Sequence, residues 1–301
     1  MSEVVLTCII PVSQVNPYFG RLSSLILNLN RFKQIQTILV HDVHDSESSI
    51  LIDSLLHKLP KDRLTFLEGT FGSPGEARNS ALELVATPWV IFTDGDDSIF
   101  PDKYLQILHA AIESAADIAI AGIKVTDFVD TSRTSTHLIN PLLSIQENLS
   151  LMPAFTRVLY RTNFIKGLRF PNFLMAEDQC FLFSVLQRKP KFFVSDEIVY
   201  EYFVGRPSQL TSKSSPAILD LRKSIECILQ PFGKLDKELI GTGFIFLFRL
   251  VATLIRRLGF SSLPILYQLA PRILYVSIAH PSYFLHSLKK FLLFRKALIS
   301  A

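Results

Sequence analysis

Residues 74–97, PGEARNSALELVATPWVIFTDGDD, pass from a helical pattern to a short apolar run and then to a cluster of acidic residues. Proline and glutamate in the first turn are typical of a helix start, and the WVIF run is typical of a buried strand. The run ends at Asp94, Asp96 and Asp97. Carboxylates this close repel one another unless a cation lies between them. The stretch therefore predicts a helix, a strand and a cation-binding site where the strand ends.

The same alternation extends along the chain. Strand patterns at 4–12, 36–43, 63–69 and 117–125 alternate with helical patterns at 18–32, 48–59, 74–86 and 102–116. This order predicts an α/β fold, with βαβ crossovers and an open, mostly parallel sheet that has helices on both faces. Ligands bind outside the carboxyl ends of the strands in such sheets, and Asp42 and Asp94 both fall at that edge.

The second half of the chain is less regular. We expect a surface loop or irregular excursion over residues 126–140, a helix that begins at Glu177 or Asp178, and a strand over 191–204. From Ala217 onward the pattern is helical.

Charge divides the 301 residues unevenly. Residues 1–212 contain 18 Lys and Arg against 23 Asp and Glu, whereas residues 213–301 contain 13 against 4. We therefore expect a catalytic domain over residues 1–212 and a basic, apolar helical region over residues 213–301, whose partner should be anionic. The three cysteines lack metal-ligand spacing and the start lacks signal-peptide features, so a cytoplasmic protein with reduced thiols is expected.

The side chains and spacing of Asp94 and Asp96 are suited to binding a metal ion. Gly95 between them removes side-chain bulk, and the two carboxylates point the same way in an extended or turning backbone. Such a pair can hold Mg²⁺ or Mn²⁺ through one or two oxygens and leave positions for phosphate and water. A divalent ion on a diphosphate neutralises charge as the diphosphate departs. An Asp-Gly turn without a metal is the competing interpretation.

Four further features bear on this choice. They are Arg78 and Asn79 on the helix before the acidic strand, Asp42 at the end of the second strand, Glu177 and Asp178 at a helix start, and Arg206 and Ser208 in a loop after a strand. With these features in this order, residues 4–212 resemble the inverting glycosyltransferases of family 2, which have the GT-A fold. The segment GEARNSALELVATPWVIFTDGDD, residues 75–97, is the most specific part of the resemblance.

The resemblance implies a metal-dependent inverting transferase. It would move a sugar from a nucleotide-sugar donor to a hydroxyl of a glycan or lipid-linked acceptor in cell-surface polysaccharide synthesis. Asp42 would contact the nucleotide base, Arg78 would support the base or diphosphate, Asp94 would face the ribose, and Asp96 would hold Mn²⁺ or Mg²⁺. Pro11, Val12 and Gly95 belong to the same predicted nucleotide-sugar site.

The remaining roles also come from the resemblance. Asp178, or else Glu177, would be the general base that deprotonates the acceptor, and Arg206 and Ser208 would close a loop over the leaving diphosphate. A single base without a nucleophilic carboxylate gives inversion. Each residue has a structural alternative: Arg78 could balance charge on its helix, the two acids could complement a helix dipole, and Arg206 could be a solvated loop charge.

The sequence departs from the family pattern after the second strand. Family members often have two adjacent acids there, as in an Asp-Asp-Gly-Ser run, whereas residues 40–46 read VHDVHDS. His41 replaces the first acid and Val43 the usual glycine. These changes leave the donor nucleotide open more than the reaction.

The C-terminal region combines apolar and basic residues. Residues 239–301 contain eight Lys and Arg and no acid, and residues 241–260 have no uncharged run longer than eight residues before Arg249. A spanning helix needs about 20 mostly apolar residues, so none is expected. Arg249, Arg256 and Arg257 would lie along one helical face opposite Phe and Leu, which predicts peripheral association with the anionic inner face of the cell membrane.

Other interpretations remain open at this point. The C-terminal helices could instead pack on the catalytic domain or form a homo-oligomer, and no nucleic-acid-binding motif is present. A sugar-phosphate nucleotidyltransferase would need a glycine-rich basic loop after the first strand, which PVSQVNPYFGR, residues 11–21, does not provide. A catalytically inactive scaffold at the membrane is the third alternative, and the intact set of Asp94, Asp96 and Asp178 argues against it.

Overall fold

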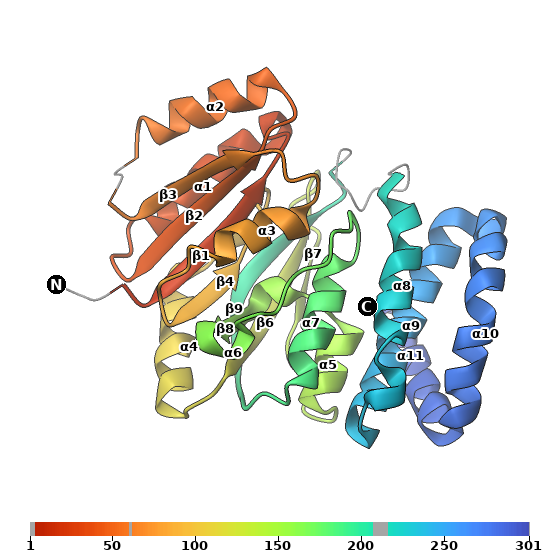
Figure 1. The fold of residues 1–301 in the computed structure, drawn as a ribbon. Coiled ribbons are helices and arrows are strands. Elements are labelled where there is room, and N and C mark those ends of the chain that lie inside the picture. Colours follow the sequence, from red (N-terminus) through yellow and green to blue (C-terminus); the bar gives the residue numbers. More distant parts are fainter. Residues whose placement is uncertain (1–3, 60–61, 207–215, 301) are drawn as a thin grey trace. The chain divides into compact units, whose positions relative to one another are not determined.

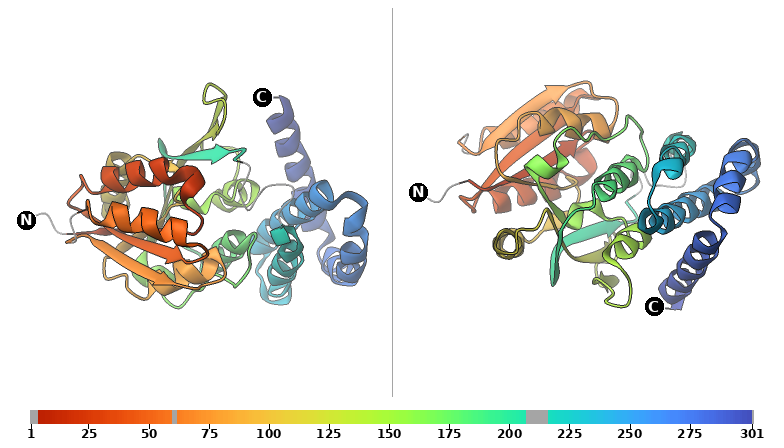
Figure 2. Two further views of the ribbon diagram at one scale, coloured as in Figure 1. Left: turned by 90° about the horizontal axis from the view of Figure 1, so that it is seen from above. Right: turned by 60° about the horizontal axis from the view of Figure 1, so that its bottom comes forward.

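The computed structural model describes residues 4–59, 62–206 and 216–300. The chain forms two compact units, the first from Met1–Ile139, Ala154–Asn172 and Pro190–Gln209, and the second from Asn140–Pro153, Phe173–Lys189 and Leu210–Ala301. The first unit contains every strand of the described residues, and the described part of the second consists of helices (Figures 1 and 2). The predicted boundary between residues 212 and 213 lies outside the described residues.

The first unit follows the predicted alternation of strands and helices. Its strands are β1 (Leu6–Val12), β2 (Ile35–Asp42), β3 (Leu64–Gly69), β4 (Trp89–Phe92), β5 (Ser98–Ile99), β6 (Ile118–Asp127), β7 (Thr134–His137), β8 (Val158–Arg161) and β9 (Phe192–Val204). Its helices are η1 (Asn16–Tyr18), α1 (Phe19–Leu29), α2 (Ser46–Leu56), α3 (Pro74–Leu82), α4 (Pro101–Glu113), η2 (Phe155–Arg157) and α6 (Thr162–Ile165).

One mixed sheet organises this unit, in the order β3-β2-β1-β4-β8-β6-β9-β5, with β7 paired to β6. Strands β3, β2, β1 and β4 are parallel neighbours, as the continuous apolar runs predict. The register pairs Val12 of β1 with His41 of β2, and Ile9 with Phe92 of β4. Residues that follow β2 and β4 therefore emerge at one edge of the sheet, on either side of the end of β1.

Aromatic packing anchors the segment that carries the acidic cluster. The Phe92 ring, at the end of β4, lies 5.7 Å from Phe155, 5.7 Å from Tyr160 and 5.1 Å from Phe170 between centroids. Asn79 of α3 exchanges two hydrogen bonds with the Phe170 backbone, donating to its carbonyl oxygen and accepting from its N–H, both at 2.8 Å. These contacts hold α3 and the end of β4 as one buried block.

The expectation of a loop over residues 126–140 is wrong in part. Thr134–His137 forms strand β7, which pairs antiparallel with β6. Asp127 closes the connecting turn, because its Oδ1 accepts hydrogen bonds from the N–H groups of Val129 and Asp130 at 2.9 and 2.8 Å. The strand was missed because its side chains are polar and mostly exposed, so it has no alternating apolar pattern.

The second unit is built around one long helix. Its helices are α5 (Ile145–Leu151), α7 (Glu177–Gln187), η3 (Pro216–Asp220), α8 (Leu221–Leu229), η4 (Phe232–Lys234), α9 (Lys237–Leu258), η5 (Gly259–Ser262), α10 (Leu263–Ala279) and α11 (Pro281–Ser300). Helices α5, α8 and α11 pack against α9. The unit thus takes in α5 and α7, which lie within the stretch predicted as catalytic domain.

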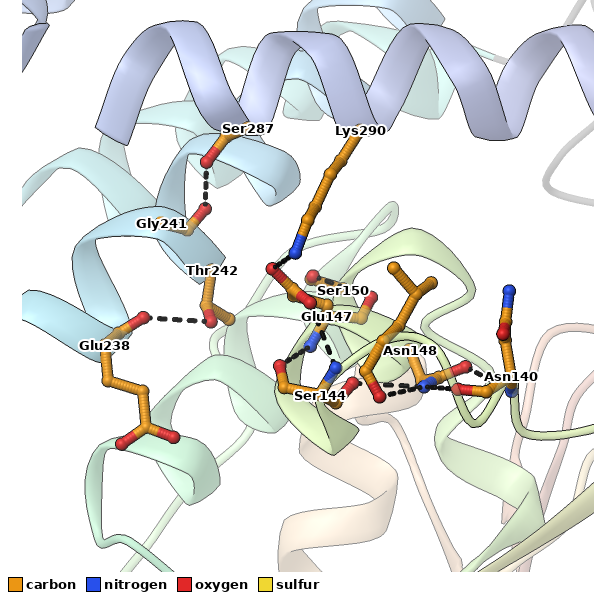
Figure 3. A network of polar contacts seen from close by, with 11 residues as sticks. Asn140, Ser144, Glu147, Asn148, Ser150, Glu238, Gly241, Thr242, Ser287 and Lys290 are labelled. Atoms are coloured by element: carbon orange, nitrogen blue, oxygen red, sulfur yellow. Dashed lines mark hydrogen bonds and ion pairs between the residues drawn. The ribbon is translucent and has the colours of Figure 1, made fainter. Parts of the chain in front are cut away.

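Polar contacts fix how α11 faces its neighbours (Figure 3). The Ser287 side chain is buried, and its hydroxyl donates a hydrogen bond to the Gly241 carbonyl oxygen of α9 at 3.0 Å. Lys290 forms an ion pair with Glu147, which also completes a capping box with Ser144 at the start of α5. One face of α11 therefore packs against α5 and α9.

Arg249 does not lie on an outer basic face, so that expectation is wrong for this residue. Its guanidinium donates to the Leu151 carbonyl at the end of α5, and its Nε is buried. Burial lowers the pKa of Arg249 to about 10, an effect that the negative charge of Asp178 partly offsets. Spacing alone placed Arg249 with Arg256, but packing of α5 against α9 turned it inward.

Candidate functional site

The turn after β4 lies close to the end of β1 and the start of α1. A Cβ atom at Gly95 would stand 2.7 Å from Val12 Cγ1 and 3.3 Å from Tyr18 Cε2. Both distances are shorter than ordinary contacts, and the nearer one involves a β-branched side chain with little freedom to move. Glycine is thus needed here for close approach, and the acidic turn is fixed against β1.

Asp94 forms an ion pair with a buried arginine. Arg78 Nη2 donates to Asp94 Oδ1 at 2.8 Å, and Arg78 is almost fully buried. The guanidinium also lies 4.7 Å from the Phe155 ring and 5.4 Å from the Phe170 ring. Ser73 caps α3 and so sets where Arg78 falls on the helix. The geometry indicates that the main role of Arg78 is to hold the Asp94 carboxylate in place.

Asp96 forms an ion pair of its own. Arg206 donates to Asp96 Oδ2 from Nε at 3.1 Å and from Nη2 at 2.7 Å, and both side chains are largely buried. The Arg206 guanidinium lies 4.7 Å from the centre of the Tyr18 ring. Burial, followed by the charge of Asp96, raises the pKa of Tyr18 above its usual range. Residues 96 and 206, distant in sequence, thus meet at the sheet edge.

Asp97, the third acid of the cluster, is fully buried and has a structural role. Its Oδ2 accepts a hydrogen bond from the Tyr200 hydroxyl at 2.6 Å, and its Oδ1 accepts one from the Phe203 N–H at 2.8 Å. The same Tyr200 oxygen accepts a hydrogen bond from the Asp94 N–H at 3.2 Å. Burial, reinforced by the charges of Asp96 and Asp94, raises the pKa of Asp97 well above its usual range. Asp97 therefore fastens the acidic turn to β9.

Asp42 lies at the same edge, at the end of β2. Its Oδ1 accepts from the Phe71 N–H at 2.8 Å, and its Oδ2 accepts from the Gly72 N–H at 3.2 Å. His44 Nε2 approaches Oδ2 at 3.3 Å. The Asp42 carboxylate thus holds the backbone of the loop between β3 and α3 at the carboxyl edge of the sheet.

The structure brings most of the predicted donor-site residues to one place. Val12 ends β1 beneath Gly95, Pro11 precedes it, and the ion pairs of Asp94 and Asp96 follow β4. Ser208 lies outside the described residues.

Glu177 and Asp178 belong to the second unit and begin α7, as predicted. Glu177 is buried and Asp178 is half-buried. The residue before them, Ala176, has a left-handed backbone with φ of 63°, which is uncommon for a residue other than glycine. The preceding loop is held by α8, because Ser224 donates to the Met175 carbonyl at 2.8 Å. Backbone strain of this kind persists where packing enforces it, and it is common at functional sites.

Two aromatic residues of the site were not predicted. Tyr18 faces Arg206, and Tyr200 connects Asp94 to Asp97. Neither has a local sequence signature, since Tyr18 follows a proline in a short helical turn and Tyr200 occupies an ordinary position in a strand. The acidic cluster in the sequence already included Asp97. Only the fold shows that Asp97 has a structural role, whereas Asp96 pairs with Arg206 at the sheet edge.

Residues 7–184, more than half of the chain, match the family described as Glycosyl transferase family 2. Among curated proteins, the chain is 22% identical over 209 residues to a poly(ribitol-phosphate) beta-glucosyltransferase of Bacillus spizizenii, covering 68% of this chain and 33% of that protein. It is 25% identical over 219 residues to the minor teichoic acid biosynthesis protein GgaB of Bacillus subtilis, covering 69% of this chain and 24% of GgaB. The chain thus spans about a third and a quarter of these two relatives.

Solved structures show the same architecture. The structure of residues 1–349 of Staphylococcus aureus TarS in complex with UDP superposes with a TM-score of 0.60 at 20% identity, covering 86% of this chain and 73% of that one. A mannosyltransferase from Pyrobaculum calidifontis in complex with GDP-Man and Mn²⁺ gives a TM-score of 0.59 at 14% identity, covering 97% and 88%. The predicted fold class, a GT-A sheet with helices and a C-terminal helical region, is confirmed.

Proposed function

Because this chain belongs to glycosyltransferase family 2, we propose that it transfers a sugar from a nucleotide-sugar donor to a hydroxyl of its acceptor, with inversion. The prediction of a glycosyltransferase is confirmed at the level of the family. One observation carries the finer proposal: Asp94, Asp96 and their two arginines lie with Asp42 at the carboxyl edge of parallel strands. That edge is where α/β sheets bind ligands.

A divalent ion fits this site if it is held partly by the substrate. The described residues contain no group of three His, Cys, Asp or Glu side chains placed to hold a metal. Mg²⁺ and Mn²⁺ can be held by one or two carboxylates together with diphosphate oxygens and water. Asp96 would be the protein ligand. When bound, the ion would neutralise charge on the leaving diphosphate.

The arginine pairs suggest how the chain itself would serve the donor. Arg206 binds the carboxylate that would hold the ion, so a cation and Arg206 compete for Asp96. Arg206 released from Asp96 would stabilise the leaving diphosphate, which is the role proposed for it. Arg78 would act as a positioning residue that keeps Asp94 directed at the donor ribose. Asp42 would contact the nucleotide base, together with the loop that it shapes.

We propose Asp178 as the general base, with Glu177 as the alternative. Asp178 is the more exposed of the two, which favours access by an acceptor hydroxyl. Arg249 in the same unit interacts electrostatically with Asp178. One carboxylate acting on the incoming hydroxyl is sufficient for single displacement and therefore for inversion.

The names of the curated relatives support a class of acceptor. One name contains poly(ribitol-phosphate) and the other teichoic acid biosynthesis, which supports a polymeric acceptor, and we propose a glycan or lipid-linked acceptor in cell-surface polysaccharide synthesis. The enzyme would work in the cytoplasm, peripherally at the inner face of the membrane. The donor sugar and nucleotide are left to experiment.

Donor turnover by the purified full chain tests the reaction. Nucleotide release would be measured from UDP-, GDP-, CMP- and dTDP-sugars with Mn²⁺, with Mg²⁺ and with EDTA. We expect slow hydrolysis of one donor that requires the metal. Asp96→Asn should lower it by about a thousandfold, since losing the ion removes several kcal/mol of charge stabilisation. Asp178→Asn should abolish transfer to acceptor once the acceptor is supplied.

Asp62→Asn is the matched control, because Asp62 is an exposed carboxylate beside β3. It should turn over donor at the rate of the unsubstituted enzyme. Equal activity of Asp96→Asn and Asp62→Asn would contradict the metal-binding role. If no donor is hydrolysed and none shifts the thermal unfolding midpoint, the inactive scaffold would replace the transferase.

A further inference from the structure

We infer that the outward faces of α10 and α11 form a docking surface for an anionic lipid bilayer. The inference deepens the membrane partner proposed above, and its test does not depend on the donor chemistry. Below, the outer face denotes the exposed stripes of these two helices, Leu263, Tyr267, Leu274 and Ile278 on α10 and Leu285, Lys289, Leu292 and Lys296 on α11.

Helix α10 is apolar on both sides. Its buried residues, Leu269 and Val276, are seven apart and lie on one face. Tyr267, Leu274 and Ile278 lie on the opposite face and are 82%, 60% and 69% exposed. A surface helix of a soluble protein normally carries polar residues on its outward face. Its 17 residues contain one charged side chain, Arg272, so this helix lacks such a face.

Helix α11 has an outer stripe of a different composition. Leu285, Lys289, Leu292 and Lys296 follow one another at intervals of four, three and four, and all four are exposed. The inner side is fixed by the contacts of Ser287 and Lys290 with the neighbouring helices, as Figure 3 shows. The alternation of leucine and lysine is therefore on the outside and is not a packing face.

The extent of the exposed apolar surface calls for a partner. Besides the stripes, Phe260 at the turn between α9 and α10 is 91% exposed, and Tyr275 is also exposed. Tyr267, Leu274 and Ile278 follow one another along the exposed side of α10, and apolar surface that is continuous in this way marks interaction sites in soluble proteins. In Figure 1, α10 lies at the outer edge of the second unit, away from α5 and α7 of the same unit.

Charge decides between a second copy of the chain and a lipid surface. From residue 239 to the end there are eight Lys and Arg and no acid. In a symmetric dimer through this face, Lys289 and Lys296 of each copy would meet a face that carries the same positive charges, and like charges repel. An anionic bilayer supplies phosphate for the lysines and an acyl boundary for the leucines, while tyrosines suit the interface between them.

The surface fits docking better than crossing. Within the described residues, one helical stretch, residues 237–279, is long and apolar enough to span a membrane by length and composition. It comprises α9 and α10, and α9 is a core helix that buries Phe244, Ile245 and Phe246 inside its unit. Helix α10 alone is 17 residues long and carries Pro271 and Arg272 near its middle. A span needs about 20 mostly apolar residues.

Flotation of the full chain with lipid vesicles tests the inference. Vesicles of phosphatidylcholine alone would be compared with vesicles that contain about 30% phosphatidylglycerol, without donor or acceptor. We expect binding to the anionic vesicles that falls with rising salt. The double variant Leu274→Glu/Ile278→Glu should abolish it. Lys289→Gln/Lys296→Gln should weaken it by about 25-fold, since each surface cation contributes about fivefold.

Matched controls separate this face from general effects of charge. Ile50→Glu/Leu142→Glu places the same charges at exposed apolar positions elsewhere, and Lys33→Gln/Lys58→Gln removes two exposed lysines of the first unit. Both controls should bind vesicles like the unsubstituted chain. The thermal unfolding midpoint of all four variants should match that of the unsubstituted chain, which shows that they fold without reference to donor turnover.

Three results would overturn the inference. The first is that the chain does not float with either kind of vesicle. The second is that the outer-face variants float as well as their controls. Alternatively, light scattering would show a dimer that Leu274→Glu/Ile278→Glu dissociates, in which case a second copy covers the face. A failure of donor turnover would leave the vesicle result intact, so the two proposals can fail separately.

Discussion

The carboxyl edge of the first unit and the outer face of the second differ in how they treat charge. At the carboxyl edge, Asp94 and Asp96 each meet an arginine, and Asp97 meets a tyrosine hydroxyl and a backbone N–H. On the outer face, Lys289 and Lys296 alternate with exposed leucines. The first region balances its charges internally, whereas the second presents one sign of charge to its surroundings.

This difference indicates two kinds of recognition. A preorganised set of paired groups can exchange partners with a small charged ligand at low cost, because its geometry is already held. An exposed basic and apolar surface gains its binding energy from buried area and charge attraction together, and it suits an extended anionic partner. Substitutions in the first region should therefore have large, local effects, and those in the second should have small effects on folding.

The largest effect is expected at Arg78. Arg78→Met removes an almost fully buried cation from Asp94, whose carboxylate is itself 36% exposed, so we expect a cost of about 3 kcal/mol, the low end of the range for breaking a buried pair. Urea unfolding would measure the loss. Arg133→Met is the control, because Arg133 forms an exposed pair with Asp130 in the turn before β7, and it should cost less than about 1 kcal/mol. Equal losses would mean that the carboxyl edge is no more tightly organised than the surface.

Asp97→Ala should lower the free energy of unfolding by about 3 kcal/mol. It removes the acceptor of two buried hydrogen bonds, from the Tyr200 hydroxyl and the Phe203 N–H, and leaves a small cavity. Tyr200→Phe removes one of the two and should cost about 1 kcal/mol. Thermal or urea unfolding of both would be compared with Asp130→Ala in the exposed turn before β7. A loss of donor binding with unchanged stability would instead place Asp97 in contact with the ligand.

Gly95→Ala should cost about 1–3 kcal/mol and should weaken donor binding. The added methyl would meet Val12 at 2.7 Å, so the acidic turn must move away from β1. Gly20→Ala in α1 has open space around the new methyl and should be neutral or stabilising by about 0.5–1 kcal/mol. Unfolding and donor titration report the two parts. A neutral Gly95→Ala would show that the turn has room to adjust.

The smallest effect is expected at Glu147 in the second unit. Burial opposes ionisation there, but the hydrogen bond and charge of Lys290 prevail and hold the pKa of Glu147 below its usual range. A depressed pKa means that the stabilisation is present at neutral pH and is lost as the pH falls through the folded-state pKa. Because the pair is partly solvated, Lys290→Met should cost only about 0.5–1 kcal/mol.

Glu147→Gln tests the same ion pair through the pH dependence of stability. It should remove this part of the acid dependence, so its stability should fall less steeply than that of the unsubstituted chain as the pH drops below about 4.3, the ordinary pKa of a glutamate. Stability curves against pH for the two chains would be compared. Parallel curves would exclude a contribution from the Glu147 carboxylate.

Local sequence patterns were sufficient to predict the parallel half of the sheet, because buried strands and amphipathic helices leave continuous apolar runs and a 3.6-residue period. They also predicted the acidic turn after β4 and a helix start at Glu177 or Asp178, where α7 begins at Glu177, since caps and acids at element ends are local features. Strand β7 was missed because an exposed polar strand leaves no such pattern.

The pairing of the charged side chains could not be predicted from the sequence, because it joins residues that are far apart along the chain. Asp96 and Arg206 are 110 residues apart, and Asp97 and Tyr200 are 103 apart. Periodicity reports how one segment is buried, but it contains nothing on which distant segment covers it. For the same reason Arg249 and Arg256, seven apart on α9, could be assigned to one face from spacing, although packing of α5 turns the first inward and leaves the second exposed. The partner of a charge is a property of the packed chain, since it depends on contacts that form only when distant segments come together.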